Sequence, residues 1–318
     1  MTERPQFNKE IIQLEIYGEN ISLIKSSSSK EVECSFLGPN GTYTEQATLD
    51  LLGNQATLLP LNRITEVVEA VEEKKVDLGL VPIENSTEGN VVETIRSIIR
   101  SKNLTIVGEK VIPIHHMLLG SEKAFSKKIV RSHPQAIGQC TNWLKENLPG
   151  AEVITHNSTS EAVKTAAEHD ELGIGSSLAG EIYQIPILKE NIEDLKGNTT
   201  RFWLIGRGET NPTDSDKTML LFSLKNRVGL LKNSLAVFAD RNINMTKIDS
   251  FPIGALDEYY FLLAIDGHKK DPKIADALSD FQQTCLKVRN LGSFHKSPTP
   301  DKYFAPNALT DGWLEPQT

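Results

Sequence analysis

The sequence is poor in the features that mark several classes of protein. Only three of its 318 residues are cysteine, and their scattered positions suit free thiols in a reducing compartment better than disulfides or a metal site. No apolar run approaches the roughly 20 residues that cross a bilayer, and no signal-peptide pattern opens the chain. A net charge of −8 argues against a nucleic-acid surface. We therefore expect a cytoplasmic protein that binds neither membrane nor nucleic acid.

Short apolar runs alternate with amphipathic stretches over residues 34–207, which is typical of an α/β domain with mostly parallel strands. The pattern predicts strands at 33–37, 77–82, 105–107, 111–119, 128–130, 152–154, 172–176 and 202–206. It predicts helices at 42–52, 63–74, 88–101, 134–147, 158–168 and 177–181.

Other segments flank this domain. Residues 1–33 form an extension that ends in a Ser-rich flexible stretch, and residues 208–216 are a Gly, Pro and Asp-rich linker. Residues 217–295 follow the order βαββαβ, which is ferredoxin-like, and this unit is small enough to need a packing partner. The Pro-rich tail, 296–318, is expected to be irregular.

The stretch FLGPNGTYTEQA, residues 36–47, ends a strand in a Gly-Pro turn and opens a helix. Thr42 and Glu45 have the spacing of a capping box, as do Ser158 and Glu161 further along. The free N–H groups of such a helix start attract an anion, although a plain strand-turn-helix junction explains the pattern equally well. Neither a dinucleotide fingerprint nor a phosphate-binding loop is present, so nucleotide binding is not expected.

Polar residues also follow three predicted strands, where open α/β sheets bind ligands. The stretch VPIENSTEGN, residues 81–90, is either part of a site or a loop that caps the next helix. RSHPQAIGQC, 131–140, and GNTTRFWLIG, 197–206, offer further polar side chains, and a fixed arginine can bind a carboxylate with two parallel hydrogen bonds. His115 and His116 should point to opposite faces of a strand, so we expect one of them in the core.

Seven stretches together resemble the prephenate dehydratase family, in the family's order over residues 33–207: FLGPNGTYTEQA, LGLVPIENSTEGNV, IPIHHMLLG, SHPQAIGQC, STSEAVKTAA, GIGSSLAGEIY and NTTRFWLIG. RVGLLKNSLAVFADRNINMTKIDS is similar to an ACT domain, an amino-acid-sensing module. The resemblance implies two lobes of the type II periplasmic-binding-protein kind around a cleft. It also implies conversion of prephenate to phenylpyruvate, water and carbon dioxide in phenylalanine biosynthesis, with no cofactor or metal. L-Phenylalanine would be the feedback effector, and the assembly a homodimer or homotetramer.

The resemblance also assigns roles to residues of the cleft. Catalytic roles fall on Thr200, Glu84, Asn85, Ser132 and Gln139, and substrate binding on Thr42, Ser86, Thr199, Arg201 and Phe202. Thr199 stands where the family often has lysine, so Arg201 is expected to do more of the carboxylate binding. We expect Glu84, Asn85 and Ser86 to face Thr200, with Thr200 acting on the leaving hydroxyl and Glu84 or a water supplying the proton.

In the ACT domain, the family's two effector motifs fall on Gly229, Leu230 and Leu231 and on Asp249, Ser250, Phe251 and Pro252. Phe251 replaces an arginine, which should alter how phenylalanine binding is coupled to closure, or shift the effector. Arogenate dehydratase and a catalytically inactive amino-acid sensor remain alternatives to the main prediction. A fused chorismate mutase is not expected, because residues 1–33 are too few for its long helices.

Overall fold

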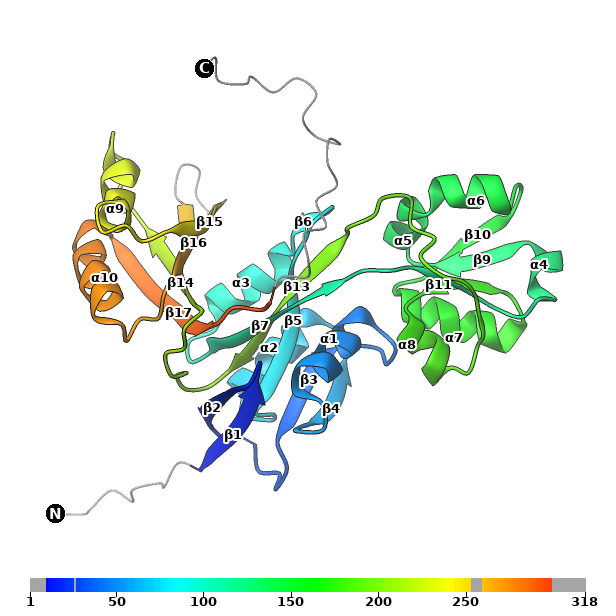
Figure 1. The fold of residues 1–318 in the computed structure, drawn as a ribbon, viewed down its shortest axis with the longest axis horizontal. Helices are drawn as coiled ribbons and strands as arrows, with labels where there is room; N and C mark the ends of the chain where they lie inside the picture. Colours follow the sequence, from blue (N-terminus) through cyan, green and yellow to red (C-terminus); the bar gives the residue numbers. More distant parts are fainter. Residues whose placement is uncertain (1–9, 26, 253–258, 299–318) are drawn as a thin grey trace.

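The computed structural model describes residues 10–25, 27–252 and 259–298. Figure 1 shows three bodies in a row: a first lobe in the centre, a second lobe at one end and the C-terminal unit at the other. The fold class expected from the sequence, two α/β lobes and a βαββαβ unit, is confirmed.

The first lobe is built on a mixed sheet with the strand order β4-β3-β5-β13-β7. Its strands are β3 (Glu33–Leu37), β4 (Thr57–Leu61), β5 (Leu78–Asn85), β7 (Thr105–Pro113) and β13 (Thr199–Gly206), with the short β6 (Gly89–Asn90) beside β5. Its helices are α1 (Tyr43–Leu52), α2 (Ile64–Glu72) and α3 (Val92–Arg100). The buried residues Ile64, Val67, Val68 and Val71 form one apolar stripe along α2, which explains why this segment is a helix packed on the sheet.

The second lobe is inserted between β7 and β13. Its sheet has the order β10-β9-β11-β8-β12, with β8 (Met117–Leu119), β9 (Ile129–Ser132), β10 (Glu152–Thr155), β11 (Leu172–Gly175) and β12 (Ile187–Lys189). Its helices are α4 (Ala124–Lys127), α5 (Pro134–Gln139), α6 (Thr141–Asn147), α7 (Thr159–His169) and α8 (Ser177–Ile182). Two segments, 114–116 and 190–198, therefore connect the lobes.

The sheets are less parallel than the sequence pattern predicts. β13 returns from the second lobe and pairs antiparallel with both β5 and β7, while β8 pairs antiparallel with β11 and β12. The predicted strand 111–119 is interrupted at 114–116, where the chain leaves one sheet for the other. The predicted helix 134–147 is divided at Cys140 into α5 and α6.

The N-terminal extension forms a hairpin over part of its described residues. β1 (Ile11–Ile16) and β2 (Glu19–Ile24) are joined at Tyr17 and Gly18, which both have positive φ, as a two-residue hairpin turn requires. Alternate residues of β1 are buried in the same apolar cluster as Phe36 of β3 and Leu204 of β13. The hairpin is thus part of the first lobe; residues 1–9 lie outside the described ranges.

The C-terminal unit has one sheet, β15-β16-β14-β17, with helices on one face and the first lobe on the other. Its elements are β14 (Asp216–Ser223), α9 (Leu230–Ala239), β15 (Met245–Pro252), β16 (Tyr259–Asp266), α10 (Pro272–Thr284) and β17 (Lys287–His295). Phe222, Phe238 and Phe281 pack together between sheet and helices. Met219 and Leu262, on the other face, share a cluster with Ile95 and Ile98 of α3, so an apolar core joins the unit to the first lobe. The tail beyond residue 298 lies outside the described ranges.

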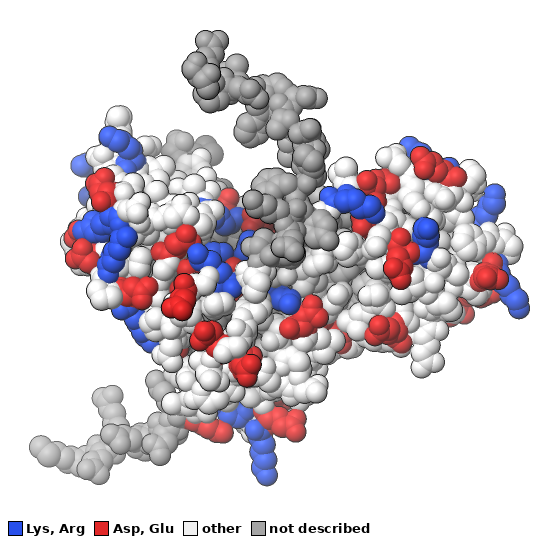
Figure 2. Space-filling model, viewed as in Figure 1, with Lys and Arg blue, Asp and Glu red and all other residues white. Residues whose placement is uncertain are grey.

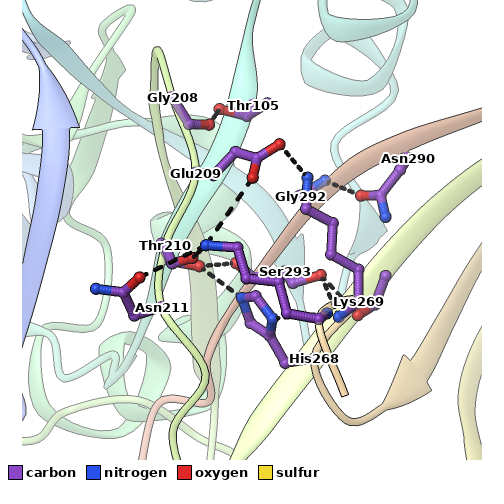
Figure 3. Close-up of polar contacts among 12 residues, drawn as sticks. Thr105, Gly208, Glu209, Thr210, Asn211, His268, Lys269, Asn290, Gly292 and Ser293 are labelled. Atoms are coloured by element: carbon purple, nitrogen blue, oxygen red, sulfur yellow. Dashed lines mark hydrogen bonds and ion pairs between the residues drawn. The ribbon is translucent and has the colours of Figure 1, made fainter. Parts of the chain in front are cut away.

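The beginning of the linker, residues 208–210, contacts both the first lobe and the C-terminal unit (Figure 3). Thr105 of β7 donates a hydrogen bond to the carbonyl of Gly208 (2.8 Å), and Glu209 pairs with Lys269 (2.6 Å). The Thr210 hydroxyl contacts the buried His268 ring (3.2 Å) and the Ser293 carbonyl. These contacts attach the linker to both domains.

The charges on the face in Figure 2 are mixed, with acidic and basic side chains interspersed over all three bodies. None of the helices within the described ranges is both long and apolar enough to span a bilayer.

We expect Leu14→Ala to lower the free energy of unfolding by about 2–5 kcal/mol, because Leu14 is 2% exposed and its removal leaves a cavity under the hairpin. Ile11→Ala is the matched control: Ile11 lies in the same strand but is 61% exposed, so its change should stay within about 0.5 kcal/mol. Urea denaturation measures both. Equal losses in the two variants would show that the hairpin does not pack as described.

Candidate active site

A cavity of about 300 Å³ lies between the two lobes. Strand ends and helix starts from both lobes line it, as expected for an α/β sheet. The first lobe contributes Leu37, Gly38, Thr42, Tyr43, Thr44, Asn62, Pro82, Asn85, Thr200 and Phe202. The second lobe and the connecting segments contribute Ile114, His116, His133, Gln135, Ala136, Gln139, Asn157, Ser158, Thr159 and Asn198.

The starts of α1 and α7 meet at this cavity. Thr42 caps α1 by accepting a hydrogen bond from the Glu45 N–H (3.3 Å), and Ser158 caps α7 by accepting one from the Glu161 N–H (3.0 Å). Among the described residues that line the cavity, none is Lys, Arg, Asp or Glu. The positive potential for an anion therefore comes from the two helix N-termini, each equivalent to about half a unit charge.

Asn85 and Thr200 lie opposite each other on β5 and β13. The Asn85 Oδ1 accepts hydrogen bonds from the backbone N–H groups of Thr87 (3.0 Å) and Glu88 (3.1 Å), which fixes the orientation of the amide. Its Nδ2 therefore donates to the Thr200 Oγ1 (2.9 Å) and to the Asn198 Oδ1 (2.7 Å). Because the Thr200 oxygen accepts this bond, its own hydrogen is free to donate into the cavity.

A second polar group spans both lobes. His116 Nε2 lies 2.8 Å from the Gln139 Oε1, and its Nδ1 lies 2.9 Å from the Tyr43 hydroxyl. Burial lowers the pKa of His116, which favours the neutral ring. Nε2–H then donates to Gln139, while the single hydrogen of the Tyr43 hydroxyl is shared between Nδ1 and the His115 carbonyl oxygen (2.7 Å). The Asn198 amide also donates to Gln139 (3.1 Å), so this group connects with the Asn85–Thr200 pair.

Sequence reasoning missed part of this site. His116 is buried, as expected for one of the two histidines, but it also lines the cavity, while His115 pairs with Glu193 (3.0 Å). The alternation of side chains along a strand does not apply to these two histidines, because β7 ends at Pro113 and both lie in a connecting segment. Asn198 had a usable signal, since it directly precedes the Thr-Thr-Arg-Phe stretch.

Five of the predicted residues line the cavity: Asn85, Thr200, Gln139, Thr42 and Phe202. Glu84 and Arg201 do not, and the expectation that they face the cleft is wrong. Neighbouring residues of a strand point to opposite faces, so Arg201 lies behind Thr200 and Glu84 behind Asn85. Arg201 pairs with Glu109 (2.9 Å) and Glu84 with Lys247 (2.8 Å), on the face that meets the C-terminal unit.

Three more predicted residues also lie outside the cavity lining. Ser132 is fully buried and donates its hydroxyl hydrogen to the Ile174 carbonyl (2.7 Å), which ties β9 to β11. Ser86 and Thr199 bond to each other: the Thr199 N–H donates to the Ser86 Oγ (3.0 Å), and the Ser86 N–H to the Thr199 carbonyl (2.9 Å). All three support the site from outside.

A second cavity, of about 320 Å³, lies in the C-terminal unit. Leu224, Lys225, Asn226, Arg227, Leu231, Tyr259 and Phe261 line it. Of the first predicted motif, Leu231 reaches this cavity, Leu230 begins α9 and Gly229 caps that helix with a φ of 77°. Of the second motif, Ser250 pairs with Phe261 and Pro252 with Tyr259, whereas Phe251 packs against the apolar cluster shared with the first lobe.

Comparison with known proteins agrees with this architecture. The prephenate dehydratase family model matches residues 34–210, and the ACT domain model matches residues 218–281. A bifunctional chorismate mutase/prephenate dehydratase from Aquifex aeolicus is 38% identical over 285 residues, which is 89% of this chain and 78% of that protein.

Two solved structures have a similar fold. A prephenate dehydratase from Arthrobacter aurescens in complex with L-Phe has a TM-score of 0.77 at 33% identity, covering 83% of this chain and 90% of that one. GqqA, described as a novel type of quorum quenching acylase, has a TM-score of 0.75 at 28% identity, covering 83% and 98%.

We expect the free energy of unfolding to fall as the pH drops below about 6.5, the ordinary histidine value, partly through His116. Because burial lowers the pKa of His116, the unfolded chain takes up a proton there that the folded protein does not. When the pH falls from about 7 to about 5, the free energy of unfolding of His116→Gln should therefore decrease less than that of the wild type. Urea denaturation at each pH measures this difference. His169→Gln, on an exposed helix end, is the control, and an unchanged slope in His116→Gln would contradict the assignment.

Proposed function

This chain belongs to the prephenate dehydratase family and carries an ACT domain, and we propose that it converts prephenate to phenylpyruvate, water and carbon dioxide in the cavity between its lobes. The observation that carries the proposal is the Asn85–Thr200 pair, which aims a free hydroxyl hydrogen into a cavity with anion-binding helix starts.

The substrate is a dianion, and the cavity suits it through backbone groups. The N-terminus of α1, in the first lobe, holds one carboxylate, and the N-terminus of α7, in the second lobe, holds the other. They take the role that the sequence suggested for Arg201. Binding one substrate between them also brings the lobes together, which orients the reacting ring.

The reaction breaks the ring C–O bond and the bond to the ring carboxylate. The electrons of the carbon–carbon bond complete the aromatic ring, carbon dioxide leaves, and the departing hydroxyl takes up one proton to become water. Thr200 donates its hydrogen bond to that oxygen, where negative charge develops. Because none of the described residues that line the cavity carries a carboxyl group, a water beside Thr200 passes the proton to the departing oxygen, and the hydroxide so formed takes up a proton from bulk solvent.

Asn85 and the group around Gln139 preorganise this donor. Asn85 directs the Thr200 hydroxyl, and Asn198 connects Asn85 to Gln139 and to neutral His116. Each polar atom in the series has a partner, so the site needs little rearrangement when charge develops.

We expect Thr200→Val to lower kcat by about 100-fold or more, because it removes the hydrogen-bond donor while keeping the side-chain shape. Thr200→Ser should retain most of the activity. Thr199→Val is the matched control, since the neighbouring threonine lies outside the cavity lining. Phenylpyruvate formation, followed with prephenate and in parallel with arogenate, measures all three. Near-normal turnover of Thr200→Val would refute the assignment, and an arogenate preference would reassign the substrate. Because the fold is also similar to that of GqqA, acylase activity is assayed in parallel as a control reaction.

We also propose feedback inhibition by L-phenylalanine at the cavity of the ACT domain. The volume of about 320 Å³ suits an amino acid, and the aromatic Tyr259 and Phe261 suit its ring. Leu231 and Tyr259 line this cavity and are exposed, as are Val228 and Ile248 elsewhere in the ACT domain, and this apolar surface supports assembly as a homodimer or homotetramer through the ACT domains, which we place in the cytoplasm.

We expect L-phenylalanine to slow phenylpyruvate formation by the wild type, and Leu231→Arg to raise the half-inhibitory concentration by about 10-fold or more, because the longer side chain fills the cavity. Leu286→Arg is the control: it adds the same charge at an exposed leucine outside this cavity. Calorimetric titration gives the L-phenylalanine affinity of each variant. A wild-type rate that does not change across the titration would refute the regulatory proposal.

A further inference from the structure

Six charged side chains form an ion-pair row between the first lobe and the ACT sheet, with signs that alternate: Lys217, Glu109, Arg201, Glu84, Lys247 and Asp249. The row begins on β14, crosses β7, β13 and β5, and ends on β15. Three members thus belong to the catalytic sheet, and the other three, Lys217, Lys247 and Asp249, belong to the ACT domain.

Arg201 is the centre of the row. Its Nη1 lies 2.9 Å from the Glu109 Oε2 and its Nε lies 3.5 Å from the Glu84 Oε2. Glu109 is 1% exposed and also pairs with Lys217 (3.0 Å). Burial alone would raise the pKa of Glu109, but Arg201 and Lys217 outweigh burial and hold it below the ordinary value. Glu109 is therefore a fixed anion to which Arg201 is anchored.

Lys247 makes the connection to the ACT domain. Its Nζ lies 2.8 Å from the Glu84 Oε1 and 2.9 Å from the Asn90 Oδ1, both in the first lobe. The same Nζ lies 3.0 Å from the Asp249 Oδ2 on its own strand. One ammonium group thus joins β5 and β6 to the strand that carries the second effector motif.

The ion-pair row lies on the opposite face of the first-lobe sheet from Thr200 and Asn85. Arg201 and Glu84 are paired across β13 and β5, and the next pair along these strands is Thr200 and Asn85. The strands point the first pair at the ACT sheet and the second pair into the cavity. A displacement of Arg201 or Glu84 therefore changes the geometry of the Asn85–Thr200 hydrogen bond.

We propose that Arg201 is a positioning residue, which sets the Asn85–Thr200 pair from behind the sheet, and that Lys247 couples this pair to β15 of the ACT domain. The inference rests on the proposed reaction for its kinetic readout. It replaces the substrate-binding role that the sequence suggested for Arg201.

The first experiment separates positioning from substrate binding. Arg201→Met should lower kcat by about 10-fold to 100-fold while KM for prephenate stays within about three-fold, because only the alignment of the donor changes. Arg201→Lys, which keeps the charge, should restore part of kcat. A rise in KM with unchanged kcat would mean that Arg201 binds substrate, and unchanged values of both would remove any role.

Arg289→Met is the matched control. Arg289 also crosses the interface, from β17 to backbone carbonyls at Ile98 and Leu104, and its side-chain hydrogen bonds within the described residues go to neither β5 nor β13. Its removal tests whether any loss of interdomain contact slows the reaction. If Arg289→Met lowers kcat as much as Arg201→Met, the effect is general docking and the proposal fails.

The second experiment needs no turnover. By hydrogen exchange on the full-length protein, Lys247→Met should speed amide exchange in residues 81–90 and 199–206, with Arg289→Met as control. It should also raise the half-inhibitory L-phenylalanine concentration by about five-fold or more, with the calorimetric affinity within about two-fold. Unchanged exchange in Lys247→Met would overturn the coupling. A wild type that lacks turnover or inhibition would instead refute the proposed function, and the exchange result would still stand alone.

Discussion

The site depends on one strand pairing, in which β13 lies antiparallel between β5 and β7. This pairing places Thr200 beside Asn85 and, on the other face, Arg201 beside Glu84 and near Glu109. It also brings the two segments that connect the lobes to one side of the sheet, where the cavity forms. A single register therefore determines the chemistry on one face and the attachment of the ACT domain on the other.

Most of the fold could be predicted because its signals are local. Capping residues such as Thr42 and Ser158 marked helix starts within a residue, and alternating apolar runs marked most of the strands. The hairpin strands β1 and β2 were missed, and so were β4 and β12, which lie at the outer edges of their sheets and carry a proline within or beside the strand, Pro60 and Pro186, that argues against a strand. The antiparallel pairing of β13 was also missed, because it joins segments far apart in the sequence.

The candidate site was predictable in part, because five of the ten residues predicted for the cleft line the cavity. The family expected from seven motifs is confirmed, and the motifs placed Asn85, Thr200 and Gln139 in one cavity. Motif membership does not specify which face of a strand a side chain occupies. Alternation separates Thr200 from Arg201 and Asn85 from Glu84. A register shift at Ile83 then places Ile83 and Glu84 together in the lining of a small cavity at the ACT interface. His116 needed the tertiary structure, because the break after Pro113 leaves no strand periodicity to follow.

The insertion of the second lobe between β7 and β13 has a consequence for folding order. Residues 117–189 can pair their strands among themselves as soon as they leave the ribosome, since all five partners lie within that range. The first sheet, although it begins much earlier, stays divided between β5 and β7 until β13 arrives to fill the gap between them. During synthesis, the edges of β5 and β7 that β13 will join stay unpaired while more than 80 further residues are made, from Pro113 to Thr199. In this interval the nascent chain is prone to aggregation and is a substrate for chaperones.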